Sequence, residues 1–171
     1  MEVFVNMKEI DIRTLTVNPF DRLHKQWALL SSGTPGDFNM MTVSWGALGV
    51  IWQKPSCTVY VRQSRYTKEF IDKNECFTLS FLKDGHREAL NLLGSQSGRD
   101  LDKMTESGLT PVFVDGCPTF AEAELVLVCR KVYALHMPVE NFFDPAIAKA
   151  NYADGDTHTQ YIGEIIAAYE N

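Results

Sequence analysis

Apolar and polar residues alternate along three stretches of the chain, which is the pattern of β-strands that bury one face. The stretches are MMTVSWG at 40–46, SCTVYVR at 56–62 and CFTLSFL at 76–82. Their apolar positions are Met41, Val43, Trp45, Cys57, Val59, Val61, Phe77, Leu79 and Phe81. Their polar-face positions are Thr42, Ser44, Thr58, Tyr60, Arg62, Thr78 and Ser80. We therefore expect three half-buried strands.

Three further segments have strand character. WALLSSG at 27–33 reads as a strand that ends at Gly33, and the following TPGDFN is typical of a turn. AELVLVCRKVYALH at 123–136 is rich in Val and Leu and predicts a central strand. THTQYIGEIIAAY at 157–169 predicts the last strand, in which Gly163 marks a bulge or a point of close approach.

Short helices are predicted between the strands. TKEFIDKN at 67–74 has Thr67 as a candidate N-cap and Glu69 in its first turn. HREALNLLG at 86–94 stops at Gly94, and SGRDLDKMTESG at 97–108 begins at Ser97 and ends at Gly108. Many strands, few helices and no βαβ alternation favour a mainly β fold: a closed or nearly closed antiparallel barrel with peripheral short helices.

Composition narrows the functional classes. The 171 residues fit one domain spanning 1–171, and the net charge of −6 argues against nucleic-acid or anionic-membrane binding. MEVFVNMKEIDIR lacks the pattern of a signal peptide, and no apolar run is long enough to span a membrane. The cysteines are widely spaced, so we expect four reduced, mostly buried thiols, no metal site and a cytoplasmic location. These cysteines are Cys57, Cys76, Cys117 and Cys129.

One segment of this acidic chain gathers cations and hydroxyls where a strand passes into a helix. VYVRQSRYTKEF at 59–70 places Arg62, Ser64, Arg65 and Thr67 next to a helix N-terminus. Guanidinium groups, backbone N–H donors and the helix dipole together suit a phosphate group. A solvated turn with two surface arginines explains the same segment, and the segment alone leaves both interpretations open. Motifs for Rossmann dinucleotide binding, a P-loop and a hydrolase nucleophile elbow are absent.

Read together, the motifs resemble the flavin-reductase-like FMN-binding split-barrel family, which includes the flavoredoxins. The ordered set is NMMTVSW at 39–45, KP at 54–55, VYVRQSRYT at 59–67, FTLSF at 77–81, SGRDLDK at 97–103 and GDTHTQYIGE at 155–164. The resemblance covers most of the chain. It implies a six-stranded split β-barrel of Greek-key type, and a homodimer with FMN near the subunit interface.

The resemblance also implies roles for residues. Phosphate-binding positions would be Arg62, Ser64, Arg65 and Thr67, with Tyr66 and Asn39 in the same motifs. Positions lining the flavin ring would be Met41, Thr42, Ser44 and Trp45. Ser97 and Lys103 match positions that approach the flavin or its phosphate.

His158 is the candidate catalytic residue, beside the flavin; the alternative is a strand-edge histidine bonded to a carboxylate such as Asp156. The segment at 138–156 looks like an insertion, in which Phe142, Phe143 and Tyr152 cover the flavin or pack a dimer. Three functions follow from the resemblance. The first is an FMN-dependent oxidoreductase that uses NAD(P)H as electron donor. The second is a flavoredoxin-type carrier served by a redox partner protein. The third is a non-catalytic flavin-binding module.

Overall fold

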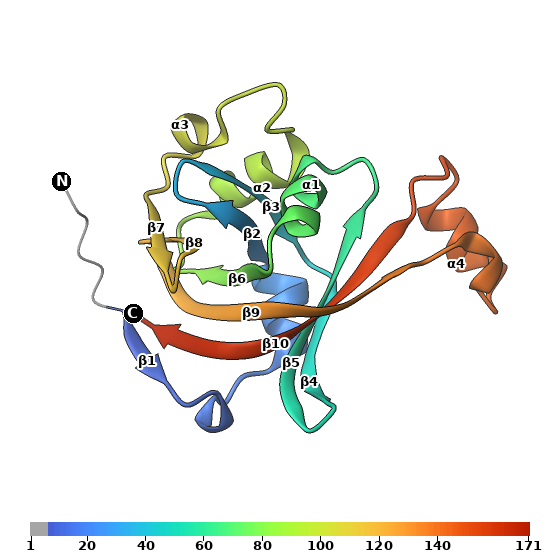
Figure 1. The fold of residues 1–171 in the computed structure, drawn as a ribbon. Helices are drawn as coiled ribbons and strands as arrows, with labels where there is room; N and C mark the ends of the chain where they lie inside the picture. The colour runs from blue at the N-terminus through green and yellow to red at the C-terminus, as the bar shows by residue number, and fades with distance from the viewer. Residues whose placement is uncertain (1–6) are drawn as a thin grey trace.

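The computed structural model describes residues 7–171, so the first six residues, on which the leader prediction partly rests, lie outside the description. Its main feature is one antiparallel sheet that curls into a barrel (Figure 1). The strands of this sheet are β1 (Lys8–Ile10), β2 (Ala28–Thr34), β3 (Asp37–Val43), β4 (Gly46–Ile51), β5 (Lys54–Arg62), β6 (Cys76–Leu82), β9 (Ala123–His136) and β10 (His158–Glu170). A separate hairpin is formed by β7 (Pro111–Val114) and β8 (Cys117–Phe120).

The sheet runs in the order β3-β2-β6-β9-β10-β5-β4, with β1 added beside β10. Its end strands β3 and β4 do not pair with each other, although only Ser44 and Trp45 separate them in the chain. The barrel is therefore split at this two-residue link. The antiparallel split barrel with peripheral helices is confirmed, although the sheet has eight strands where the resemblance implied a six-stranded barrel.

Alternation decides which side chains fill the barrel. The predicted apolar positions on β5 and β6 are fully buried, and they form one core with Leu30, Met41 and Tyr161. β9 is the predicted central strand, between β6 and β10. At Gly163 the β9–β10 register shifts, and a Cβ there would lie 2.7 Å from the Phe77 ring. Gly163 is thus both a bulge and a point of close approach, as the sequence indicated.

The helices are short and lie outside the barrel (Figure 1). They are α1 (Tyr66–Lys73), α2 (Arg87–Ser95), α3 (Lys103–Ser107) and α4 (Pro145–Asn151). Three further helical segments are the short 3₁₀ helices Ile12–Thr14 and Val139–Asn141 and the π-helix Asp21–Gln26. Thr67 is not the N-cap of α1; that position is Arg65, and Thr67 lies inside the helix. The third helix begins at Lys103 after the capping carboxylate of Asp102, not at Ser97, while Gly108 ends it in a left-handed conformation.

The prediction of four reduced cysteines is wrong for two of them. Cys76 at the start of β6 and Cys117 on β8 form a disulfide, whereas Cys57 and Cys129 are free and buried. The β7–β8 hairpin packs over the outer face of β6, where Thr78 donates a hydrogen bond to the Pro118 carbonyl and the Ser80 and Thr119 hydroxyls pair. This packing joins cysteines 41 residues apart, which their spacing does not reveal. It also removes the cysteine argument for a cytoplasmic location.

An arm extends beyond the barrel between β9 and β10 and carries α4 (Figure 1). It corresponds to the insertion-like segment at 138–156. Phe143 in this arm is fully exposed, whereas Tyr152 at its inner end is buried. No helix in the described part of the chain is long and apolar enough to cross a membrane.

Candidate functional site

Three cavities lie in a row beside the split in the barrel. A cationic cavity of about 270 Å³ shares Met41, Arg62 and Arg65 with a middle cavity of about 180 Å³. The middle cavity shares Ser44, Trp45 and Tyr60 with a larger apolar cavity of about 490 Å³. The shared walls make one trough that passes from cationic to apolar.

The cationic cavity holds two poorly solvated cations. Arg65 is half-buried, and its guanidinium makes no hydrogen bond or ion pair with any residue of 7–171. Burial, and then repulsion from Arg62, lower its pKa, although Asp156 partly offsets them. Lys103 is 5% exposed, and its Nζ donates to the carbonyls of Met40 (2.8 Å) and Leu93 (3.2 Å), which leaves one N–H. Burial, and then repulsion from Arg65, lower the Lys103 pKa to about 8.

Neighbouring elements complete this cavity. Its other lining residues are Ser64, Tyr66, Thr67, Ser95, Gln96 and Ser97. The first turn of α1 brings unpaired backbone N–H groups to the same place. Asn39 does not line the cavity; its Nδ2 donates to Thr67 Oγ1 at 3.1 Å and so fixes the Thr67 side chain. Eight of the predicted residues thus line one cavity, with Asn39 behind them.

Arg62 and Ser64 are engaged with the arm. Arg62 donates to the carbonyls of Asp156 (2.6 Å) and Asn151 (2.9 Å), and its guanidinium lies 5.3 Å from the Tyr152 ring centre. Ser64 donates through its hydroxyl (2.6 Å) and its backbone N–H (3.1 Å) to the Asp156 carboxylate. Two of the four predicted phosphate-binding residues therefore form hydrogen bonds with the arm. The Asp156 carboxylate already places a negative charge at the edge of the cationic cavity.

The middle cavity is formed where β3 ends. Met41, Thr42, Val43, Ser44 and Trp45 supply one wall, and Tyr60 and His158 supply the other. Thr42 Oγ1 donates to the Leu90 carbonyl at 2.5 Å, which ties β3 to α2. Trp45 is 47% exposed, and its ring centre lies 5.4 Å from that of His158. All four predicted ring-lining residues and His158 are therefore in one place.

The alternative interpretation had His158 bonded to a carboxylate such as Asp156. In the structure its hydrogen-bond partner is Tyr152 instead. His158 Nδ1 lies 2.8 Å from the Tyr152 hydroxyl, and the imidazole ring is 7% exposed. Burial, and then repulsion from Arg62, lower the His158 pKa to about 4, with Asp156 opposing them weakly. The imidazole is therefore neutral at physiological pH. The other nearby histidine, His136, bonds to Thr157 Oγ1 at 2.6 Å and lines none of the three cavities.

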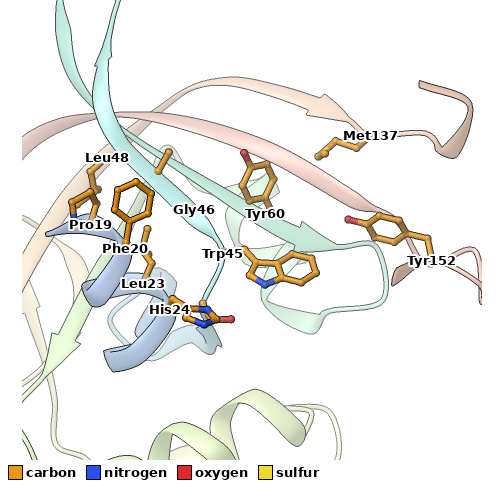
Figure 2. A pocket seen from close by; sticks show the side chains of 12 residues that line it. Pro19, Phe20, Leu23, His24, Trp45, Gly46, Leu48, Tyr60, Met137 and Tyr152 are labelled. Carbon is orange, nitrogen blue, oxygen red and sulfur yellow. The ribbon is translucent and has the colours of Figure 1, made fainter. Parts of the chain in front are cut away.

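The apolar cavity shares Trp45 and Tyr60 with the middle cavity, and these two side chains lie between its two ends (Figure 2). Figure 2 shows Pro19, Phe20 and Leu23 at one end and Met137 and Tyr152 at the other. The sequence did not reveal this cavity, because its residues come from five separated segments. For Tyr60 a signal was present, since the alternation put it on the polar face of β5 with Arg62. No cluster of three or more metal-ligating side chains occurs in residues 7–171.

Fold and site together define a split β-barrel protein with a cation-lined trough at its opening. The family model of the flavin reductase like domain matches residues 20–171. The chain therefore belongs to the flavin reductase-like family. Comparison with curated protein sequences finds no match.

Solved structures agree with this assignment. The chain is similar to a flavoredoxin from Methanosarcina acetivorans, with 27% identity and a TM-score of 0.67 over 92% of this chain and 75% of that one. It is similar in fold to an FMN-binding domain of flavin reductases-like enzyme from Shewanella baltica OS155, with 21% identity and a TM-score of 0.70 over 99% and 79%. It also resembles the NADH:FAD oxidoreductase of Streptomyces globisporus, with 18% identity and a TM-score of 0.64 over 85% and 75%.

Proposed function

We propose that this protein is an FMN-binding oxidoreductase of the flavin reductase type, which passes electrons or a hydride between NAD(P)H and an acceptor. The observation that carries the proposal is the pair of cations at one end of the trough, the half-buried Arg65 and the buried Lys103. Burial lowers the pKa of both cations, and repulsion from Arg62 acts on Arg65 while repulsion from Arg65 acts on Lys103, so a bound anion would be favoured because it would relieve this repulsion. A phosphate also matches the backbone N–H groups at the start of α1.

The trough suits the rest of FMN. With the phosphate between Arg65, Lys103 and Thr67, the ribityl chain and ring would extend past Met41 toward Thr42, Ser44 and Trp45. The cavity walls on this path are shared, so the path is continuous. Bound FMN would supply reversible acceptance of a hydride or of single electrons. The chain's own residues would bind it, orient it and limit the access of water.

His158 is the residue that we propose acts at the ring. The Tyr152 hydroxyl and His158 Nδ1 share a hydrogen bond, and we propose that the hydroxyl donates it, which would place the imidazole proton on Nε2. Since the His158 pKa is about 4, this neutral tautomer would persist at pH 7 and could donate a hydrogen bond into the middle cavity. Tyr152 would then be a positioning residue, which sets the tautomer from the arm.

Anaerobic mixing tests the function. The protein should bind FMN and turn yellow. NADH or NADPH should then bleach the flavin within seconds, which is measured as a loss of absorbance near the flavin maximum.

His158→Ala should slow bleaching per bound flavin more than it weakens FMN binding. A protein that binds no flavin contradicts the proposal entirely.

The similarity to a flavoredoxin favours a second candidate, an electron carrier that receives electrons from a partner protein. This carrier would bind FMN and accept electrons from dithionite. It would bleach slowly or not at all with either nicotinamide. The same mixing experiment therefore separates the two functions.

FMN affinity should depend on pH through Lys103. The ammonium carries its charge below its pKa of about 8 and loses it above, so FMN binding should weaken as the pH rises from 7 to 9. One charge-assisted hydrogen bond contributes about 1.5–3 kcal/mol, which corresponds to roughly tenfold or more in Kd. Fluorescence titrations at several pH values measure this. Lys103→Met should bind FMN weakly at all these pH values. If FMN affinity falls equally with pH in this variant, Lys103 is not the group that causes the pH dependence.

We also propose a homodimer. The β4–β5 hairpin and the outer half of β9 expose an apolar patch that consists of Val50, Ile51, Trp52, Val132, Tyr133 and Leu135. Beyond Lys131 one edge of β9 has no strand partner among the described residues. An exposed aromatic patch beside an open strand edge is typical of an interface.

Light scattering at micromolar concentration should therefore give twice the mass of one chain. Trp52→Glu should produce monomers, because it puts a charge into the patch next to Tyr133, whose ring centre lies 6.3 Å from that of Trp52. Phe143→Ser removes an even more exposed aromatic side chain, which lies in the arm and outside the patch, and should leave the mass unchanged. A monomeric wild-type protein that still binds FMN would contradict the dimer alone.

A further inference from the structure

The apolar cavity is larger than the two cavities that we assign to FMN, and FMN as placed above does not enter it. It is bounded by the π-helix Asp21–Gln26 and its preceding residues, by the start of β4, by β5 and by the base of the arm. Gly46 allows this close packing, because a Cβ there would lie 2.7 Å from the Thr58 carbonyl oxygen and 3.5 Å from Leu23. The cavity is thus formed by packed elements of the barrel.

The side chains that line the apolar cavity are mostly apolar. The lining consists of Pro19, Phe20, Leu23, His24, Ser44, Trp45, Gly46, Ala47, Leu48, Tyr60, Met137 and Tyr152. This described lining contains no Lys, Arg, Asp or Glu, in contrast to the cationic cavity at the other end of the trough. A charged ligand would lose hydration here without gaining a partner, so the cavity selects against it.

Two aromatic side chains offer faces to a ligand. Phe20 is 81% exposed and Trp45 is 47% exposed, although both line a concave space. Exposed aromatic rings in a cavity of about 490 Å³ are typical of sites for small ring compounds. Trp45, Tyr60 and Ser44 also line the middle cavity, so an occupant would lie directly beside whatever fills that cavity.

We propose that the apolar cavity binds an uncharged, planar aromatic compound. Such a compound would stack against Trp45 and Phe20, with the hydroxyls of Tyr60 and Ser44 available to orient a polar substituent. That it serves as the reaction partner of the flavin rests on the proposed function, whereas its binding does not. The phosphates of a dinucleotide find no cation in this cavity, which makes the occupant the acceptor rather than NAD(P)H.

Isothermal titration calorimetry tests the proposal with 2-naphthol as a neutral probe and 2-naphthoate as its anionic counterpart. In FMN-loaded protein, where FMN occupies the cationic end, 2-naphthoate should bind at least about tenfold more weakly than 2-naphthol. Phe20→Ser should weaken 2-naphthol binding by roughly fivefold and leave FMN affinity unchanged. Ala47→Asp, which places a carboxylate at the exposed wall, should weaken it by at least about tenfold.

Phe143→Ser is the matched control, since it removes an exposed phenyl group that lines none of the three cavities, and it should bind 2-naphthol as the wild type does. The proposal is overturned if 2-naphthol does not bind, if Phe20→Ser and Phe143→Ser behave alike, or if FMN displaces 2-naphthol. A protein that binds no FMN would refute the proposed function, yet 2-naphthol titration of that protein, with and without Phe20→Ser, would still decide whether the cavity is a binding site.

Discussion

Replacing Arg65 by alanine should weaken FMN binding by roughly ten- to hundredfold and leave riboflavin binding nearly unchanged. The guanidinium has no protein partner in residues 7–171 and lies in the cationic cavity, so its charge is available to a phosphate. A hydrogen bond to a charged group contributes about 1.5–3 kcal/mol, and about 1.4 kcal/mol corresponds to tenfold in affinity. Riboflavin lacks the phosphate, so its affinity should not change in Arg65→Ala. Fluorescence titration with both flavins measures the ratio of the two affinities.

Two other arginines make this experiment specific. Arg130 forms a surface ion pair with Glu164 away from the cavity, so Arg130→Ala should change neither affinity. Arg62→Ala should weaken FMN binding and also loosen the arm, because Arg62 holds the carbonyls of Asn151 and Asp156. Limited proteolysis would detect the loosened arm. If FMN and riboflavin affinities fall together in Arg65→Ala, Arg65 does not bind the phosphate.

Gly163→Ala should lower the free energy of unfolding by about 2–3 kcal/mol, the cost of overpacking a tight core. The added methyl group would lie 2.7 Å from the Phe77 ring and 2.8 Å from the Cys129 Cβ, where both neighbours are fully buried. In a chain of this size the change corresponds to a fall of about 5–10 °C in Tm. Thermal unfolding followed by circular dichroism measures it.

Gly49→Ala is the control for this substitution. Gly49 also lies in a strand, but a Cβ added there would meet no atom within 4 Å, so alanine at this position should be neutral or slightly stabilising. Equal Tm changes in the two variants would show that a general effect of alanine in strands operates, and that the contact with Phe77 does not matter.

Much of the barrel could be predicted because burial imposes a period of two on each strand. The apolar positions of 56–62 and 76–82 are buried as the alternation indicated, and the run at 123–136 is the central strand. The same rule fails where both faces are covered. Thr78 and Ser80 are fully buried because the β7–β8 hairpin packs on them, and this hairpin also brings Cys76 to Cys117.

The candidate site was predictable in part. The motif residues from Met41 to Trp45 and from Arg62 to Thr67 gather at the split, because β3 and β5 lie at or next to the ends of the sheet. Helix boundaries failed near the site. Thr67 accepts a hydrogen bond from Asn39 instead of capping α1. The third helix begins only at Lys103, because Asp102 provides its N-cap. In both places a tertiary or capping partner prevailed over local preference.

The sequence by itself determined six of the strands, the buried faces of β5 and β6 and the cation-rich motif, because these depend on local alternation and on the chemistry of adjacent residues. It did not reveal β1, β4, β7 or β8, and it placed Trp45 on a buried strand face, although Trp45 follows the end of β3 and is 47% exposed. Only the tertiary structure decided which cation is available to a ligand, that Tyr152 pairs with His158, and that an apolar cavity adjoins Trp45. These features join segments far apart in the chain, such as 19–24, 44–48 and 137–158. Their contacts are set by how the sheet curls and where the arm packs, and neither leaves a periodic pattern in the sequence.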